Sequence, residues 1–317
     1  MNRPRPADYG IAVHVDELVR LRPPLAIAGF APAGPVRTHM FGNYRSGFRG
    51  RGMEFAESRI YQPGDDIRAI DWRLTARSGR THTKLFHEER ERPVMVLVDS
   101  RAMMRFGSRD CFKSVLAARA AALLGWVALD GGDRIGGLLL AANGLRTLAP
   151  QRSRSQLLQL LQQLALATQS DALASNQTSE PTLAEALSRL NQLARPGSLL
   201  FVISDFHDLD GLAVTELRRL ARRHTVTNLL VHDALELQAP ANGHYQLSDG
   251  ATVATFDGFD PKQRAAYRRP FAARQQLLQQ LGQQQRMALL PLRTGDEVQQ
   301  ILQPQLASLS RPTRGQP

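Results

Sequence analysis

The sequence predicts an α/β fold in which a mostly parallel sheet is covered by helices on both faces. Short apolar runs such as residues 94–98, typical of strands buried on both sides, recur through residues 93–310. Stretches with helical apolar spacing separate most of these runs, as repeated β-α units require. The pair Asn143-Gly144 stands between two apolar runs and predicts one antiparallel hairpin.

The elements can be placed in order along this domain. Strands are expected at residues 94–98, 135–140, 198–203, 226–231 and 288–292, with the antiparallel strand at 145–148. Helices are expected at about 109–129, around Leu157 to Leu164 after Ser153 or Ser155, after Pro181-Thr182, around Leu212 to Ala221, at about 261–285 and at 296–309. We therefore expect a domain over residues 93–310 and a disordered tail over 311–317.

Residues 1–92 have a different character, and we treat them as a separate N-terminal segment. Residues 45–92 hold eleven Arg or Lys and eight Asp or Glu, too many charges for a core. Pro63-Gly64 suits the centre of a type II turn, which would present Asp65 and Asp66 at its exit. We expect a small charged module of strands and loops, docked on something larger.

Composition limits the partners and the compartment. The net charge of +11 is carried almost entirely by arginine, so a nucleic-acid-binding protein is the alternative to keep open. The arginines are interleaved with Asp and Glu, however, and no five-residue basic run occurs. With no apolar run of about 18 residues, no signal-peptide pattern and one cysteine, Cys111, we expect a cytoplasmic protein.

Several kinds of enzyme are disfavoured by the motifs. None of the three lysines follows a glycine, so a phosphate-binding P-loop is missing, and neither a Gly-x-Ser-x-Gly elbow nor a zinc pattern occurs. A metal-dependent hydrolase using Asp65, Asp66, Asp71 and the histidines lacks a base placed beside a nucleophile. We expect a protein that is not an enzyme.

Polar residues follow two of the expected strands, and a third opens a helix between them. Asp99 and Asp205 stand at strand ends, and Thr182 stands where a helix begins. In parallel sheets such groups meet at one edge, and their oxygens are the ligands that Mg²⁺ prefers. The alternative is that these residues simply cap the turns and helices that follow.

A more specific signal lies before the domain. The strings Arg49-Gly50-Arg51-Gly52-Met53-Glu54-Phe55, Arg59-Ile60-Tyr61-Gln62-Pro63-Gly64-Asp65-Asp66-Ile67-Arg68-Ala69-Ile70-Asp71-Trp72-Arg73 and Ala76-Arg77 occur in this order. They resemble the signature of a bacterial family catalogued as a domain of unknown function, number fifty-eight. Members of that family carry the signature just before a von Willebrand factor A-like domain, and the layout agrees from about residue 40 to 300.

The resemblance implies a metal-ion-dependent adhesion site in that domain. Asp99, Thr182 and Asp205 match its parts, but Arg101 and Met103 occupy the positions of the two serines in its Asp-x-Ser-x-Ser motif. A guanidinium supplies the positive charge of a cation, and a thioether is a poor ligand for Mg²⁺. We therefore expect a degenerate site with no cofactor, Mg²⁺ being the ion at issue, and an ion pair of Arg101 with Asp99 or Asp205.

The resemblance also implies a biological setting. Such proteins are commonly paired with a MoxR-type AAA+ ATPase in chaperone-like maturation or assembly of other proteins. We expect a non-catalytic adaptor that binds this ATPase and a protein client. The charged signature residues either fix their segment in place or form the face where a partner docks, with Trp72 and Tyr61 as apolar anchors. Both alternatives stay open.

Overall fold

The computed structural model describes residues 8–23, 30, 53–62, 67–88, 93–169, 180–240, 243–248 and 253–302. For residues 53–57 and 85–88 the description covers the backbone only. The chain divides into two compact units, one formed by residues 1–34 with 92–317 and the other by residues 35–91. Each unit is described by itself.

The larger unit is built on a six-stranded sheet. Its strands are β3 (Pro93–Asp99), β4 (Arg134–Ala141), β5 (Gly144–Gln151), β6 (Leu199–Ser204), β7 (Thr225–His232) and β10 (Ala288–Arg293). They lie in the order β10-β7-β6-β3-β4-β5, and every neighbouring pair is parallel except β4 with β5. Counted along the sheet this is the doubly wound order 3-2-1-4-5-6. The predicted α/β fold with a mostly parallel sheet is confirmed.

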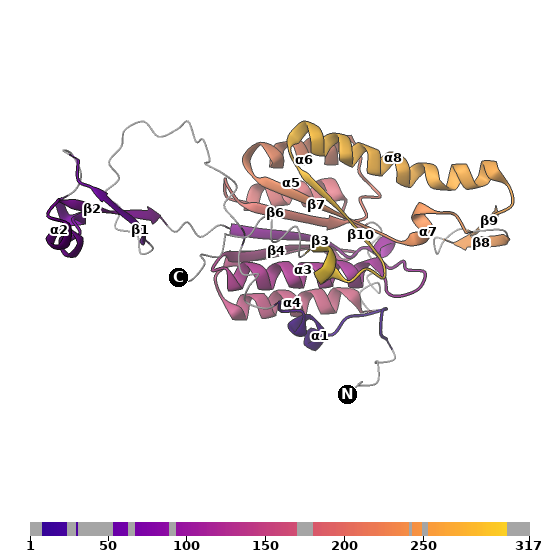
Figure 1. The fold of residues 1–317 in the computed structure, drawn as a ribbon. Helices are drawn as coiled ribbons and strands as arrows, with labels where there is room; N and C mark the ends of the chain where they lie inside the picture. The colour runs from indigo at the N-terminus through magenta and orange to yellow at the C-terminus, as the bar shows by residue number, and fades with distance from the viewer. Residues whose placement is uncertain are drawn as a thin grey trace. The chain divides into compact units, whose positions relative to one another are not determined.

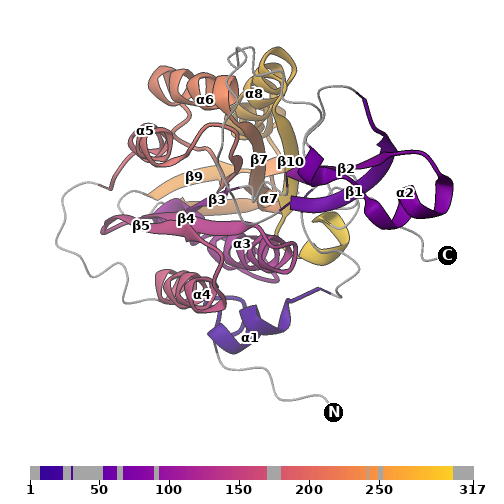
Figure 2. The same ribbon diagram turned by 90° about the vertical axis from the view of Figure 1, so that its left-hand side faces the viewer.

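Helices cover both faces of this sheet (Figures 1 and 2). One face carries α1 (Val15–Arg20), α3 (Lys113–Asp130) and α4 (Arg154–Thr168), and the other carries α5 (Leu183–Leu193), α6 (Gly211–Arg223) and α8 (Pro261–Gln285). Each face encloses its own apolar core, because strand side chains alternate between the two: Val96 and Val98 join one, Met95 and Leu97 the other.

Short elements complete the larger unit. They are the 3₁₀ turn η3 (Ala102–Met104), the helix α7 (Ala234–Leu237), and the antiparallel hairpin of β8 (His244–Ser248) and β9 (Val253–Asp257). Neither η3, α7 nor the β8–β9 hairpin was predicted from the sequence. Helix α3 begins at Lys113 rather than 109, so Cys111 lies just before it. Of the helix expected at 296–309, residues 298–302 are helical, and the rest lies outside the described residues.

The division of the chain differs from the expectation at its beginning. Residues 1–92 were expected to form one segment, but residues 8–22 pack against the sheet's helices. Leu18 is fully buried, its carbonyl accepts a hydrogen bond from Trp126 Nε1 at 3.0 Å, and Val13 N donates to Thr168 Oγ1 at 3.1 Å. Val15, Leu18 and Val19 have the spacing of an apolar helix face, which explains the packing.

The smaller unit contains an antiparallel pair and a short helix. Strand β1 (Met53–Ile60) pairs with β2 (His82–Glu88), and η2 (Ile67–Ala69) and α2 (Trp72–Ser78) lie between them in sequence. Asp71 caps α2 by accepting from Leu74 N at 3.1 Å, and Gly79 ends it with φ +69°. The expected module of strands and loops is present, and it also contains the helix α2, which was not predicted from the sequence.

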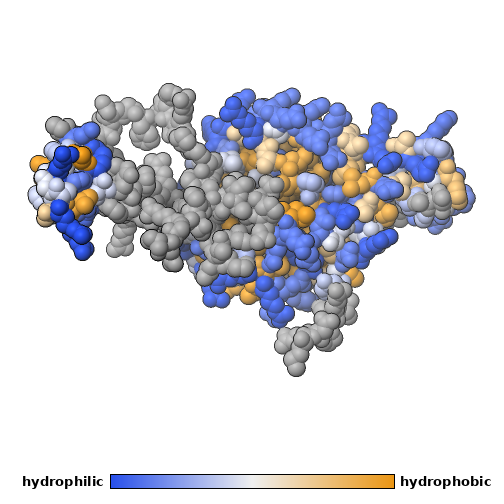
Figure 3. Space-filling view, in the orientation of Figure 1, coloured by the Kyte–Doolittle hydropathy of each residue, from blue (hydrophilic) through white to orange (hydrophobic). Residues whose placement is uncertain are grey.

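The described surface is largely polar where helices face outward. In Figure 3 hydrophilic side chains cover α6 and α8 at the top of the view, and apolar side chains show beneath them over the sheet. Within the part of the chain that the structure describes, no helix combines the length and apolar character needed to cross a bilayer.

Candidate functional site

Four parallel strands bring polar residues to one edge of the sheet. Strands β3, β6, β7 and β10 all end there, and we call it the carboxyl edge. Asp99 closes β3 and Asp205 follows β6, and both are fully buried. The expected meeting of the strand tips is therefore observed. Thr182 stands close by in the fold as the N-cap of α5.

Arg101 lies between two carboxylates at this edge. Its Nε and Nη2 donate to the two oxygens of Asp99 at 3.0 and 2.8 Å, and its Nη1 and Nη2 donate to Asp208 at 2.6 and 2.8 Å. Nη1 also donates to the carbonyl of Pro181 at 3.1 Å. We call Asp99, Arg101 and Asp208 the Arg101 cluster. The expected pair with Asp99 is present, but the second partner is Asp208 and not Asp205.

The guanidinium in this cluster is saturated. Arginine has five N–H donors, and the five bonds to Asp99, Asp208 and Pro181 use them all. Arg101 is only 2% exposed. Burial works against its charged form, but the bonds from Asp208 and Asp99 outweigh burial and raise the pKa of Arg101 above its ordinary value. The cluster therefore holds a permanent cation.

Asp208 joins this cluster to the start of α5. Its Oδ2 also accepts from Leu183 N at 2.9 Å, in the first turn of that helix. Partial burial would raise the pKa of Asp208, but the bonds from Arg101 and Leu183 N lower it overall. The cluster has one cation and two carboxylates, and the positive end of the α5 dipole offsets part of the remaining negative charge.

The residues of the expected metal site do not fit Mg²⁺. Both oxygens of Asp99 accept from Arg101, and the hydroxyl of Thr182 accepts from Glu185 N in a capping box. Met103 presents sulfur, a poor ligand for a hard cation, on a side chain that is 46% exposed. Among the residues that the structure describes, no group of three or more His, Cys, Asp and Glu is placed to hold a metal. The guanidinium of Arg101 supplies the positive charge that balances Asp99 and Asp208.

Asp205 belongs to a second buried cluster. Its Oδ2 accepts from Lys113 Nζ at 2.7 Å, and Lys113 also donates to Glu236 Oε1 at 3.1 Å. We call Lys113, Asp205 and Glu236 the Lys113 cluster. Lys113 is fully buried at the start of α3, with the Phe106 ring centroid 5.9 Å from Nζ. Burial would raise the pKa of Asp205, but His207 and Lys113 together hold it well below its usual range.

His207 stands between the two clusters. Its Nδ1 lies 3.1 Å from Asp205 Oδ1 and 3.9 Å from Asp208 Oδ1. The hydrogen bond with Asp205 raises the pKa of His207 despite partial burial. Ser204 Oγ donates to Asp99 at 2.7 Å and accepts from Phe206 N, so this hydroxyl is engaged as well.

The end of β7 is tied down by Asp233. Its Oδ2 accepts from Ser108 N at 2.9 Å and from Thr294 Oγ1 at 2.5 Å, and its Oδ1 accepts from Leu235 N. The carboxylate thus links the strand end to the loops before α3 and after β10. This capping role is the structural alternative that the sequence left open for such aspartates.

Apolar side chains are exposed on the segments that surround the clusters. Met103 lies in η3, just after Arg101, and is 46% exposed. Phe106, whose ring lies over the Lys113 ammonium, is 40% exposed, and Leu212 in the first turn of α6 is 69% exposed. The edge therefore combines buried ion pairs with exposed apolar side chains on the segments around them.

The signature residues of the smaller unit are only partly described. Arg51, Gly64, Asp65 and Asp66 lie outside the described residues, and for Glu54 only the backbone is described. Asp71 accepts from Ser58 Oγ at 3.0 Å besides capping α2, and Arg59 Nη1 donates to Ile60 O at 3.2 Å. These contacts hold the module together.

Other signature side chains face solvent. Trp72 is 68% exposed, Tyr61 is half-buried, and Arg68 and Arg73 are exposed. Trp72 is therefore exposed, and its role as an apolar anchor stays a prediction. Whether the module docks on the larger unit stays a prediction.

Sequence reasoning missed Asp208, Lys113, Glu236 and His207. Two signals were available. Residues 205–210 contain three aspartates, of which only the first was considered. Lys113 is one of three lysines in an arginine-rich chain and begins an apolar helix, where an unpaired ammonium would be costly.

Comparison with known proteins places the chain among relatives of undetermined role. The family model described as "Protein of unknown function DUF58" matches residues 57–277. The uncharacterized proteins Rv1480 of Mycobacterium tuberculosis and Mb1516 of Mycobacterium bovis are each 32% identical over 225 residues, covering 71% of this chain and 69% of theirs. The uncharacterized protein YeaD of Bacillus subtilis is 38% identical over 68 residues, 22% of this chain and 16% of its own.

Among solved structures, the conserved hypothetical protein BatB of Bacteroides thetaiotaomicron matches with a TM-score of 0.42 and 13% identity, over 68% of this chain and 97% of that one.

Proposed function

The chain belongs to the DUF58 family, and we propose that it is a non-catalytic adaptor that binds other proteins at the carboxyl edge of its sheet. The observation that carries this proposal is the saturated Arg101 cluster. A buried guanidinium with all five donors engaged fixes the charges of this edge without an ion.

The groups at this edge offer little for catalysis. Asp99, Asp205 and Asp208 are held by cations, and the hydroxyl of Ser204 is bonded on both sides. Within the described residues of the edge, His207 contacts carboxylates rather than a hydroxyl or thiol that it could activate. A rigid surface that lacks a primed nucleophile suits recognition better than reaction.

The partner that we propose is a MoxR-type AAA+ ATPase, because proteins of this kind are commonly paired with one. The ATPase would supply energy for chaperone-like maturation or assembly of a client protein. The exposed Met103, Phe106 and Leu212 are the side chains of the edge that a partner would bury. Met and aromatic side chains are enriched at the centres of protein interfaces.

Binding to the purified ATPase from the same organism tests this function. The full chain is immobilised, and affinity is measured by biolayer interferometry with Mg-ATP present throughout. Met103→Asp and Leu212→Asp each place a charge in the proposed interface, and we expect each to weaken binding about tenfold or more. Both side chains are exposed, so the fold should be retained.

Val253→Asp is the matched control, because Val253 is equally apolar and 67% exposed but lies on the β8–β9 hairpin. It should bind like the unaltered chain. An unaltered chain that fails to bind the ATPase would contradict the proposed partner. Equal binding by all three variants would contradict the proposed surface.

A further inference from the structure

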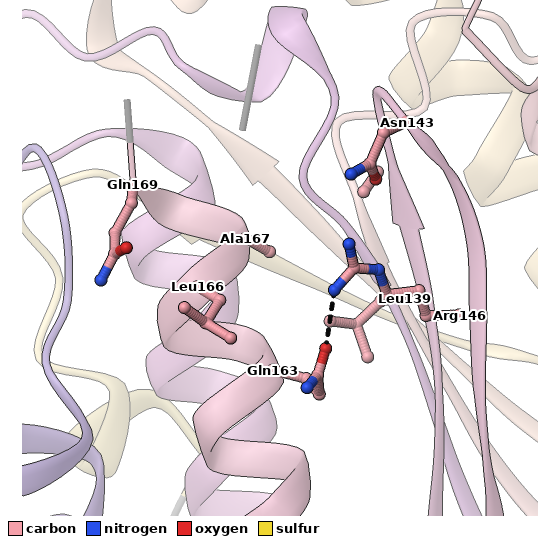
Figure 4. A pocket seen from close by; sticks show the side chains of 8 residues that line it. Leu139, Asn143, Arg146, Gln163, Leu166, Ala167 and Gln169 are labelled. Atoms are coloured by element: carbon pink, nitrogen blue, oxygen red, sulfur yellow. Dashed lines mark hydrogen bonds between the residues drawn. The ribbon is translucent and has the colours of Figure 1, made fainter. Parts of the chain in front are cut away.

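A pocket lies beside the carboxyl edge, between the β4–β5 hairpin and the last turns of α4 (Figure 4). Its volume is about 250 Å³. Ligand pockets for drug-sized molecules span roughly 300–1,000 Å³. The size of this pocket therefore suits one amino-acid residue better than a nucleotide or a large cofactor.

The pocket exists because small side chains stand where larger ones would fill it. Ala141 at the end of β4 and Ala167 in the last turn of α4 both line it, together with the buried Leu139. Leu166 is 43% exposed at the rim, whereas Leu160 and Leu164 of the same helix are at most 1% exposed. An apolar recess with an exposed leucine at its rim favours an aliphatic ligand group.

The polar part of the rim is positively charged. Arg146 is the one charged side chain among the described residues that line the pocket, where the other polar groups are amides. Gln163 Oε1 accepts from Arg146 Nη1 at 2.9 Å and holds the guanidinium at the mouth (Figure 4). Four of its five N–H donors have no partner within the described part of the chain, so an anion can still be bound.

We propose that this pocket binds an aliphatic side chain with a carboxylate next to it, the chemistry of a C-terminal Leu, Ile or Val of a peptide. The aliphatic group fills the space between Leu139, Ala141 and Ala167, and the carboxylate pairs with Arg146. Capture of a C-terminal carboxylate is a recurrent mode of peptide recognition, and arginine is a strong hydrogen-bond partner for a carboxylate.

A peptide is the source that the position favours. Ser100, the residue before Arg101, donates from its backbone N to Leu140 O at 2.8 Å, and Leu140 stands between two residues of the pocket. A protein seated on the carboxyl edge would therefore lie within reach of the pocket. The choice of a peptide as the ligand rests on the proposed adaptor function, whereas the chemistry of the pocket does not.

The test uses free probes and the full chain, so it does not depend on the ATPase. The peptide Ala-Ala-Ala-Ala-Leu is titrated at low salt, and amide and methyl NMR shifts are followed. We expect saturable shifts confined to residues of the hairpin and of α4 near the pocket. The same peptide with an amidated C-terminus should bind about two- to fivefold more weakly, the range for an exposed ion pair.

Three variants locate the binding. Ala167→Leu fills the recess and should abolish the shifts, and Arg146→Gln should make the acid and the amide bind equally. Thr147→Ala is the control, because Thr147 is the next residue on β5 and points to the opposite face. It should bind like the unaltered chain.

The proposal is overturned by shifts that do not saturate, that lie elsewhere on the protein, or that are equal for acid and amide in the unaltered chain. Octanoate is the comparison ligand for a free fatty acid. If it binds in the pocket more tightly than the peptide, the assignment of a peptide end is wrong. Failure of these titrations would leave ATPase binding unaffected, so the two proposals fail separately.

Discussion

Removal of the Arg101 guanidinium gives the sharpest perturbation of the carboxyl edge. Arg101→Met keeps the apolar stem of the side chain but removes all five N–H donors. Asp99 is fully buried and would keep only Ser204 Oγ and the backbone N of residue 101 as donors. A buried carboxylate would then lack its counter-charge.

The expected loss of stability follows from this burial. Breaking a buried ion pair by removing one partner costs about 3–5 kcal/mol. The side chain of Asp208 is 24% exposed and can be hydrated again, so most of the loss comes from Asp99. Arg101→Met should therefore lower the free energy of unfolding by about 3–4 kcal/mol at pH 7.

Urea unfolding followed by circular dichroism measures this loss. Arg219→Ala is the matched control, because its ion pair with Glu216 is equally short at 2.8 Å but Arg219 is 65% exposed. Its expected cost is about 0–1 kcal/mol. Asp99→Asn combined with Arg101→Met should recover part of the loss. If Arg101→Met costs no more than Arg219→Ala, Arg101 does not hold the edge together.

Three further predictions follow from buried groups. Lys113→Met should cost about 3–5 kcal/mol in urea unfolding because the buried Asp205 would keep only the partly exposed His207 as an ionic partner. An added Asp205→Asn should recover part of this loss, and no loss would contradict the Lys113 cluster. Leu18→Ala should cost about 2–5 kcal/mol by the same assay if residues 8–22 belong to the core, and little if they do not. Burial lowers the pKa of His232. The neutral His232 side chain therefore stabilises the folded state fully above the unfolded pKa of about 6.5, and this stability is lost as the pH falls toward the lower folded pKa. The urea unfolding midpoint should therefore drop less between pH 7.5 and pH 5.0 in His232→Gln than in the unaltered chain. An equal drop in both proteins would show that His232 does not contribute to this pH dependence.

The strands of the large unit were predictable because their apolar runs are continuous. Strands β3 and β6 are buried on both faces, so each contains an uninterrupted apolar run that ends in a polar residue. The start of α5 was predictable for a similar reason, since Thr182 and Glu185 form a capping box that is local in sequence. Both features depend on a few neighbouring residues in the sequence.

The elements that were missed depend on short or weak patterns. Helix α1 has six residues, and its apolar face is recognisable only when α3 and α4 are there to cover it. Strands β8 and β9 are five residues each and flank Asp249-Gly250, a hairpin signal that went unused.

The partners of the buried charges could not be deduced from sequence. The Arg101–Asp99 pair is local, and it was foreseen. The choice of Asp208 over Asp205 depends on the turn after β6, where Phe206 takes φ +54° and the chain brings Asp208 to the start of α5. The bond between Lys113 and Asp205 joins residues 92 positions apart. Only the packing of α3 against the sheet decides such pairs.

Calorimetric titration with Mn²⁺ tests most directly whether Arg101 has taken the place of an ion. We expect no binding heat for the unaltered chain. We expect measurable binding for Arg101→Ser combined with Met103→Ser, which restores an Asp-x-Ser-x-Ser sequence beginning at Asp99. Tight binding of Mn²⁺ by the unaltered chain, lost in Asp99→Asn, would show that Arg101 has not replaced the ion.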